Sequence, residues 1–317
     1  MKRYLITFKV LFVIIAVISI LAAQAQEGVA VSKAPARMTI TLAALGDGPV
    51  PEVNRDDVTV NQGKEPLRVT GWEPARGDRA GLDLFILIDD ACDKSLGSQL
   101  DELRTFITAQ PPTTSVGVGY MRNATVQIAQ NFTTDHTLAA KALRLPAGSV
   151  GAFGSPYLSA VSLMKGWPQH ANRRALVLVT DGIDRARRGT RPRGLSTNPD
   201  VNSTSTVGQR TGTIIYGIYA PGVGHLHRNF WEATNGQNDI ARLAEETGGQ
   251  SFFLGLQAPV SFRPYLDDVQ KMLDNQYVLT LEARRGGSEG LRPVSISTKV
   301  PGVELIAANS VWVGAGQ

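Results

Sequence analysis

Three continuous apolar runs constrain most strongly what this chain of 317 residues can fold into. They read Leu-Phe-Ile-Leu-Ile over 84–88, Arg-Ala-Leu-Val-Leu-Val-Thr over 174–180 and Thr-Ile-Ile-Tyr-Gly-Ile-Tyr over 213–219. A strand with one face in water alternates apolar and polar residues, whereas such runs are typical of parallel strands buried on both faces. Because helix-like segments lie between and after them, they predict an α/β domain with a doubly wound, mainly parallel sheet over residues 82–284.

The intervening pattern supplies the other elements of this domain. We expect strands at 116–121, 125–129 and 251–254, and helices at 95–108, 239–247 and 264–273 and after Pro156.

Segments on both sides of this domain alternate in the manner of exposed β-strands. They lie at 38–42, 57–60, 67–72 and 276–313, and they are broken by Gly- and Asn-containing turns. Residues 26–36 are small and polar and are expected to form a linker. We therefore predict a small flanking β module built from an N-terminal segment, 26–81, and a C-terminal segment, 285–317.

The N-terminus has the pattern of a cleavable export signal, residues 1–25. Lys2, Arg3 and Lys9 precede an apolar run over 10–23, and Ala-Gln-Ala over 23–25 offers a cleavage site before Gln26. The alternative is an uncleaved anchor, since residues 4–23 approach the length of a membrane span, although Lys9 interrupts them. The signal predicts a protein that is secreted or periplasmic, with no stable membrane span after cleavage.

Charge and cysteine content narrow the class of protein. Three of the 32 basic residues lie in the signal, which leaves 29 against 28 acidic residues. This balance argues against a general nucleic-acid binder, which would show a basic face.

Cys92 is the only cysteine, so no intrachain disulfide can form. Its acidic neighbours Asp90 and Asp93 favour an unreactive, packed thiol.

Acidic residues follow two of the apolar runs. Asp89, Asp90 and Asp93 come after the first run, and Asp181 and Asp184 come after the second. In open α/β sheets, ligands bind at the carboxyl ends of the strands. If both strands are central and parallel, these carboxylates should converge at one edge.

Three motifs give the chain a family resemblance. The stretches Leu-Phe-Ile-Leu-Ile-Asp89, Val-Thr-Asp181-Gly and Leu243-Ala-Glu-Glu-Thr-Gly-Gly249 resemble the von Willebrand factor A-type family, and more narrowly the VWFA-related domain of Acidobacteria. The resemblance implies a divalent-cation site made by an Asp-x-Ser-x-Ser loop, a Thr from a second loop and an Asp from a third. The matching positions are Asp89, Ala91 and Asp93 in the first loop, Ser155 in the second and Asp181 in the third, with Mg²⁺ or Ca²⁺ as the implied ion.

This sequence departs from the family's pattern at two ligand positions. Ala91 supplies no side-chain oxygen, and Asp93 adds a negative charge where a hydroxyl is the family's ligand. Three states of the site follow: it holds Mg²⁺ or Ca²⁺ structurally, it stays empty and recruits a cation such as Lys or Arg, or it is a relic with solvated carboxylates.

An arginine-rich stretch comes directly after the third loop. Its five arginines are Arg185, Arg187, Arg188, Arg191 and Arg193. They could recognise an acidic partner, or they could neutralise the neighbouring carboxylates from an exposed loop. We count them, with Asp90 and Asp184, as candidate partner-binding residues.

Together these features predict a non-enzymatic protein. No Ser lies in a nucleophile elbow, because the one Gly-x-Ser-x-Gly match, over residues 286–290, falls at a predicted turn between β segments, and no His base is linked to a motif. The resemblance implies a secreted binding or adhesion protein that contacts a protein or cell-surface ligand through the loops around Asp89, Ser155 and Asp181. The alternative is a structural or assembly component of a cell-envelope complex, contacted through its helices, with a relic metal site.

Overall fold

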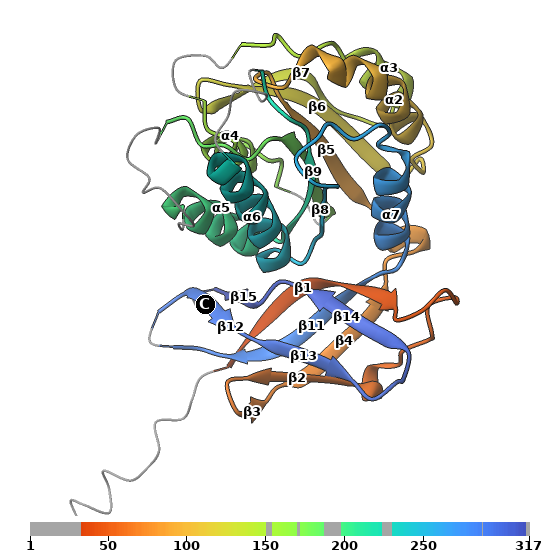
Figure 1. Cartoon of the computed structure of the whole chain (residues 1–317). Helices are drawn as coiled ribbons and strands as arrows, with labels where there is room; N and C mark the ends of the chain where they lie inside the picture. Colours follow the sequence, from red (N-terminus) through yellow and green to blue (C-terminus); the bar gives the residue numbers. More distant parts are fainter. Residues whose placement is uncertain are drawn as a thin grey trace, which may run out of the picture.

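The computed structural model describes residues 33–149, 154–169, 172–186, 198–223, 230–286 and 288–314. The predicted signal, residues 1–25, lies outside them. Two units pack against each other, an α/β unit and a smaller unit of β-strands (Figure 1).

The α/β unit is built on a six-stranded sheet with the order β10-β9-β8-β5-β6-β7. Its strands are β5 (Leu82–Asp89), β6 (Thr114–Arg122), β7 (Thr125–Thr133), β8 (Arg173–Thr180), β9 (Thr213–Tyr219) and β10 (Ser251–Phe252). The central strands β5, β8 and β9 are the three apolar runs, and every one of their residues is buried. Only the β6–β7 pair is antiparallel. The doubly wound, mainly parallel sheet is therefore confirmed.

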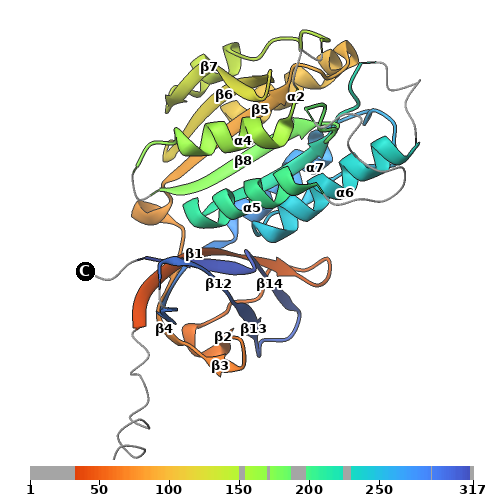
Figure 2. The ribbon, with the colours of Figure 1, turned by 90° about the vertical axis from the view of Figure 1, so that its left-hand side faces the viewer.

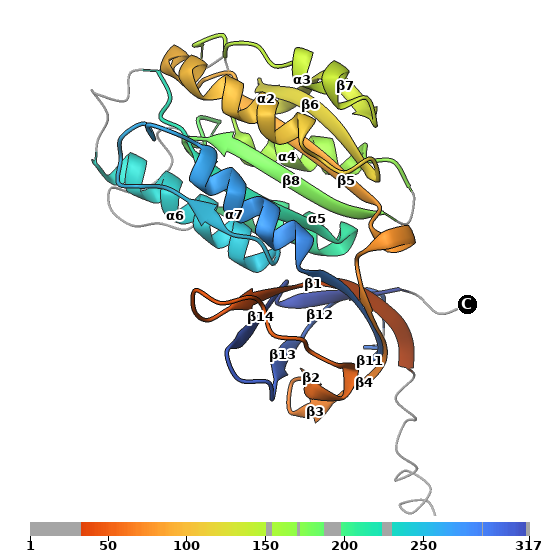
Figure 3. The same ribbon diagram turned by 90° about the vertical axis from the view of Figure 1, so that its right-hand side faces the viewer.

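Helices cover both faces of this sheet, as Figures 2 and 3 show from opposite sides. The first face carries α2 (Leu100–Thr108), α3 (His136–Lys141) and α7 (Arg263–Asp274), and the second carries α4 (Pro156–Lys165), α5 (Pro199–Thr211) and α6 (Phe230–Glu246). Alternation along β5 divides its side chains between two cores. Ile86 packs with the first group of helices, and Phe85 and Leu87 pack with the second.

Local sequence explains where two of these helices begin. Ser155 caps α4 and Asn198 caps α5, because each side-chain oxygen accepts a hydrogen bond from a backbone N–H of the first turn. Proline follows each cap, where a missing N–H costs nothing. Both helices start directly beside the carboxyl edge of the sheet, so the caps also shape the loops there.

The β unit combines strands from both ends of the chain. One sheet has the order β14-β1-β11-β4, and the smaller sheets are β13-β2-β3 and β12-β15. The bounds are β1 (Lys33–Ala44), β2 (Val58–Gln62), β3 (Glu65–Pro66), β4 (Arg68–Pro74), β11 (Gln276–Arg284), β12 (Gly290–Pro293), β13 (Ser295–Thr298), β14 (Val303–Ala307) and β15 (Ser310–Val313). The flanking β module is thus confirmed.

Several element boundaries differ from the expectations. Strand β1 begins at Lys33, within the expected linker, because Ala34 and Ala36 are buried against β11. Strand β11 ends at Arg284 but pairs with β1 and β4, so it belongs to the β unit although the boundary at 284 placed it in the α/β domain. The expected helix at 95–108 starts with a 3₁₀ segment, Lys94–Gln99.

The β unit contacts the end of the α/β unit where the parallel strands begin. Gln209, in the last turn of α5, donates a 2.7 Å hydrogen bond to Asn309. Thr247, just after α6, forms an isolated β-bridge with Ala308, and Arg173, the first residue of β8, bonds the side chain of Gln276. The opposite end of the sheet, the carboxyl edge, is therefore left uncovered by the β unit.

Within the described part of the chain, no helix is both long enough and apolar enough to cross a bilayer.

Candidate functional site

The loops that follow the parallel strands interlock at the carboxyl edge. The backbone N–H of Arg185, in the third loop, donates a 2.7 Å hydrogen bond to the carbonyl oxygen of Gly154 in the second loop. The first loop is joined to the segment after β9, because Asp93 N–H donates to Pro221 O and Val223 N–H donates to Ala91 O, each at 2.9 Å. Gly148 N–H, in the segment before Gly154, donates to Asp90 O at 3.0 Å and links these two pairs, so the edge is one connected set of loops.

Asp89 and Asp181 are brought together at this edge, as the acidic strand ends predict. Both are buried, with 6% and 2% of their surface exposed. Asp89 accepts hydrogen bonds from Ala91 N–H and Thr180 Oγ1, each at 2.9 Å, and Asp181 accepts one from Ile183 N–H at 3.0 Å. These bonds fix both carboxylates in place.

The guanidinium of Arg185 lies between these two carboxylates. Its Nη2 donates a 2.6 Å hydrogen bond to Asp181 Oδ2, and its Nη1 is 3.9 Å from Asp89 Oδ2. Nη1 also donates to the carbonyl oxygen of Ile183 at 3.2 Å, and only 8% of the Arg185 side chain is exposed. Arg185 is therefore held inside the edge and does not reach out to a partner.

The environment of Asp89 disfavours its charged form. Burial, and then the negative charge of Asp181, raise the pKa of Asp89 from 3.8 to about 6, against the opposing effects of Arg185 and the bonds from Ala91 and Thr180. One guanidinium thus compensates the two carboxylates only in part.

Asp90 belongs to a second ion pair beside the first. Arg144, in the loop after α3, binds it in bidentate fashion at 2.7 and 3.0 Å, and Ala147 N–H adds a 3.1 Å bond. The same guanidinium stacks 3.7 Å above the ring of Tyr120. Asp90 is 1% exposed and already paired, so it is not accessible to a partner. This differs from the expectation that Asp90 is a partner-binding residue.

Ser155 and Asp184 form a third polar group with Asn198 and Asp200. Ser155 Oγ accepts the capping bond of Leu158 N–H at 3.3 Å and also contacts Asp184. Asn198 Nδ2 donates a 3.1 Å bond to Asp184, and burial, with the neighbouring Asp200, raises the pKa of Asp184. Asp184 is 3% exposed, which removes it from the set of residues that could contact a partner directly.

The residues present do not fit the divalent ion that the family resemblance implies. Ser155 caps a helix and Asp93 Oδ1 accepts a 2.9 Å bond from Ser95 N–H, which caps the 3₁₀ segment. A cation, Arg185, already lies between Asp89 and Asp181. Across the described residues, no three His, Cys, Asp or Glu side chains are grouped so as to hold a metal ion.

Exposed apolar side chains gather on segments at the same edge. The described residues include nine large hydrophobic side chains that are exposed, and six of them lie on segments after strand ends or in the loop after α3: Leu145, Phe230, Trp231, Phe253, Leu254 and Val260. Phe230 and Trp231 form a T-shaped pair in the first turn of α6. Contiguous exposed apolar surface, such as that of Phe230 and Trp231, marks contact surfaces.

The strand order of the larger unit accounts for this arrangement. Parallel strands β5 and β8 lie side by side, so Asp89 and Asp181 reach the same edge. The one antiparallel strand, β7, lies at the end of the sheet next to β6. The larger unit thus has a doubly wound, mainly parallel α/β fold, as the resemblance to the von Willebrand factor A-type family implies. No family model and no curated protein matches the chain.

Three of the solved structures that resemble the chain illustrate the likeness. An aerotolerance-related membrane protein from Bacteroides fragilis, with multiple mutations to serines, is 12% identical over 61% of this chain and 99% of its own, with a TM-score of 0.42. The VWA domain of SpRpn10 is 12% identical over 59% of this chain and 94% of its own, with a TM-score of 0.38. The human COPII-coat protein Sec24c is 10% identical over 75% of this chain and 44% of its own, with a TM-score of 0.44. Such low identity transfers no ligand, so the site's own residues carry the functional argument.

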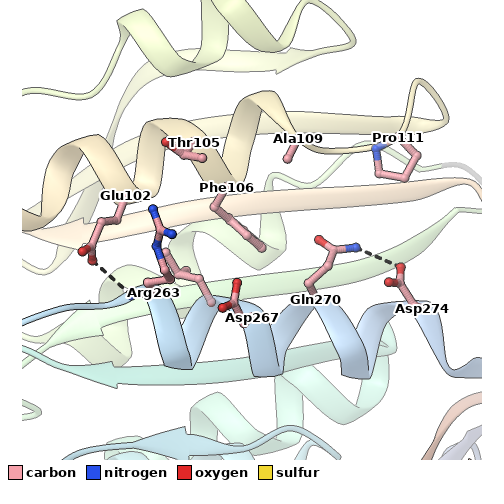
Figure 4. Close-up of a pocket in the computed structure, with 10 residues that line it drawn as sticks. Glu102, Thr105, Phe106, Ala109, Pro111, Arg263, Asp267, Gln270 and Asp274 are labelled. Atoms are coloured by element: carbon pink, nitrogen blue, oxygen red, sulfur yellow. Dashed lines mark hydrogen bonds between the residues drawn. The ribbon is translucent and has the colours of Figure 1, made fainter. Parts of the chain in front are cut away.

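A groove of about 520 Å³ lies between α2 and α7 (Figure 4). Glu102 closes one end, where it accepts a 3.1 Å hydrogen bond from Arg263 N–H. Gln270 donates a 2.9 Å bond to Asp274 at the other end, and the side chain of Asp267 is exposed between them. A partner that contacts the protein through its helices could bind in such a groove.

The arginine-rich stretch falls largely outside the described residues. Arg187, Arg188, Arg191 and Arg193 lie there, so their expected role stays a prediction. Sequence reasoning missed Arg144, because it is 54 positions from Asp90 and follows no motif. It also passed over Thr180, although the motif Val-Thr-Asp181 contains it, and its hydroxyl bonds both Asp89 and Gly182 N–H.

Proposed function

We propose that the chain is an exported, non-enzymatic binding protein whose contact surface is the carboxyl edge of its von Willebrand A-type unit. The six exposed apolar side chains on the segments at this edge carry the proposal. The β unit leaves this edge open, since it packs against the opposite end of the sheet.

Binding suits the polar residues of the edge better than catalysis. A general base needs a carboxylate lone pair that can reach a substrate. The side chains of Asp89, Asp90 and Asp181 instead accept bonds from backbone N–H groups, Thr180 and arginines, and all three are buried. They serve to hold the loops, and the exposed apolar side chains are left to contact a protein or cell-surface partner.

A matched pair of double variants tests this surface. Trp231→Ser/Leu254→Ser alters exposed side chains of the edge, and Arg263→Ser/Asp267→Ser alters exposed side chains of the α2–α7 groove. The immobilised protein is cross-linked to extracellular and envelope fractions, and captured proteins are quantified by mass spectrometry. We expect the edge variant to lose at least about tenfold of the specific capture, about 1.4 kcal/mol of binding free energy, which the loss of one anchoring contact is enough to produce, while the groove variant retains it.

The groove supports a second candidate function, a structural component of an envelope complex that is contacted through its helices. Its size, about 520 Å³, and its exposed Asp267 and Arg263 favour this candidate. If the groove variant loses the captured partner and the edge variant keeps it, the second candidate replaces the first.

Export is the part of the proposal that rests on the sequence of residues 1–25. N-terminal sequencing of the protein recovered outside the cytoplasm is expected to begin at Gln26. An intact Met1 in membrane fractions would favour the uncleaved anchor.

A further inference from the structure

The buried pair Asp89 and Asp181 needs a positive charge, and the structure supplies one from the chain itself. The carboxylates of Asp89 and Asp181 both lie against the guanidinium of Arg185, at 3.9 and 2.6 Å respectively. Burying ionised carboxylates without a compensating cation is costly. Whatever cation occupies this position therefore joins the first loop to the third.

The position is closed on the side of the segment after β9. Gly222 forms an isolated β-bridge with Cys92, and a Cβ atom added to Gly222 would overlap Asp181 Oδ2. It would also lie 2.9 Å from Arg185 Nη2 and 3.0 Å from Ala91 O. Mg²⁺ keeps several of its waters when it binds to proteins. The space around Asp181 accommodates a planar guanidinium and leaves little for a hydrated ion.

The backbone of the third loop holds Arg185 in this orientation. Arg185 and Ala186 both donate N–H bonds to Gly154 O, at 2.7 and 3.1 Å, while Arg185 Nη1 returns to Ile183 O. The guanidinium is thus anchored by its own loop and by the second loop, in addition to the two carboxylates. A side chain with this many fixed contacts is a permanent part of the edge.

We propose that Arg185 is the resident cation of this edge, so that its loops are held, and its surface is formed, without a divalent metal. This inference goes beyond the proposed function, because it concerns what joins the loops and stands whether or not the edge contacts a partner. It also implies a latent metal site, since removal of the guanidinium leaves two buried carboxylates facing a vacated position.

Melting temperatures in EDTA and in millimolar Mg²⁺, Ca²⁺ or Mn²⁺ test the proposal. The wild-type chain is expected to melt within about 1 °C in all four conditions, because Arg185 already fills the cation position. An ion bound at a hundredfold excess over its Kd would instead raise the melting temperature of a chain of this size by about 4–5 °C. Arg185→Ser is expected to gain a rise of that size with at least one of the ions. Arg185→Ser/Asp181→Asn is the matched control, and it should lose that gain.

Three results would overturn the proposal. A metal-dependent rise in the wild-type chain that disappears in Asp181→Asn shows that the position takes a metal despite Arg185. A folded Arg185→Ser variant with no metal response shows that the guanidinium does not occupy a cation site. If Arg185→Ser does not fold, direct Mn²⁺ titration of the wild-type chain by electron paramagnetic resonance decides, and saturable binding lost in Asp181→Asn overturns the proposal while its absence supports it.

Discussion

Nη2 of Arg185 donates a 2.6 Å hydrogen bond to Oδ2 of Asp181, four positions earlier in the chain, and both side chains are buried. The same guanidinium lies 3.9 Å from Asp89, which comes from the neighbouring strand. One buried cation thus connects two strand ends. The stability of the whole edge should depend on it.

Arg185→Ala is expected to lower the free energy of unfolding by about 3–5 kcal/mol, because it leaves two buried carboxylates without their cation. Urea denaturation measures the change. Lys271→Ala is the control, since Lys271 and Asp268 are paired at 3.1 Å with 75% and 49% exposure. An exposed pair of this kind contributes less than about 1 kcal/mol. Equal effects of the two variants would contradict the central position of Arg185.

The raised pKa of Asp89, about 6 against 3.8, gives this residue a defined influence on stability with pH. Because the folded form holds the proton more tightly, its stabilising effect is complete below pH 3.8 and is lost as the pH rises through 6. Asp89→Asn cannot titrate. From pH 4 to 7, the wild-type chain should therefore lose on the order of 1–3 kcal/mol relative to this variant. Urea denaturation across this range checks the sign, and a constant difference would count against it.

Gly222→Ala tests the close approach around Asp181. The added methyl group would overlap Asp181 Oδ2, and the nearby Ala91 O belongs to the backbone and cannot turn away. We expect a loss of about 1–3 kcal/mol in the free energy of unfolding. Gly48→Ala is the control, because no atom lies within 4 Å of its added Cβ, and it should change stability by less than about 0.5 kcal/mol.

The bidentate pair of Arg144 and Asp90 predicts energetic coupling between distant positions. In a double-mutant cycle with Arg144→Ala and Asp90→Asn, we expect a coupling energy of about 1.5–3 kcal/mol, as for hydrogen bonds between charged groups. Thermal or urea unfolding of the four proteins measures it. Additive effects would show that the stacking of Arg144 on Tyr120, and not the ion pair, fixes the loop.

Cys92 can report on opening of the edge. It is 1% exposed, and its Sγ lies 3.8 Å from Ala220 O and 3.9 Å from Val179 O. A thiol reagent should react with the native chain at least about 100-fold more slowly than with the urea-unfolded chain, because access requires local opening. Arg185→Ala should accelerate the native reaction. Rapid labelling of the wild-type chain would contradict a closed edge.

The sequence was most informative where burial alone sets the pattern. The runs at 84–88, 174–180 and 213–219 predicted central parallel strands covered on both faces. The acidic residues after two of them predicted that Asp89 and Asp181 would converge at one edge if both strands were central and parallel, as they are. Strand pairing was harder to predict at 33–36. Alanines carry a weak apolar signal, and their burial depends on β11, almost 250 positions away in the chain.

The inward orientation of Arg185 could not be predicted from its neighbourhood. Five arginines occur within nine residues, and composition does not distinguish the one that turns toward the carboxylates. Its orientation depends on Gly154 O from another loop and on the absence of a side chain at Gly222, 37 positions later. Tertiary contacts of this kind leave no local periodicity for the sequence to reveal.

Strands β4 and β11 pair directly, and the whole α/β unit lies between them in the chain. Entry and exit of the larger unit are therefore neighbours, with Trp72 paired to Leu279 across the junction. The larger unit is therefore connected to the β unit by two chain segments, one after β4 and one before β11, instead of by a single linker. The two connections therefore restrict rotation of the larger unit about the smaller one, and they hold the carboxyl edge at a fixed distance from the β unit.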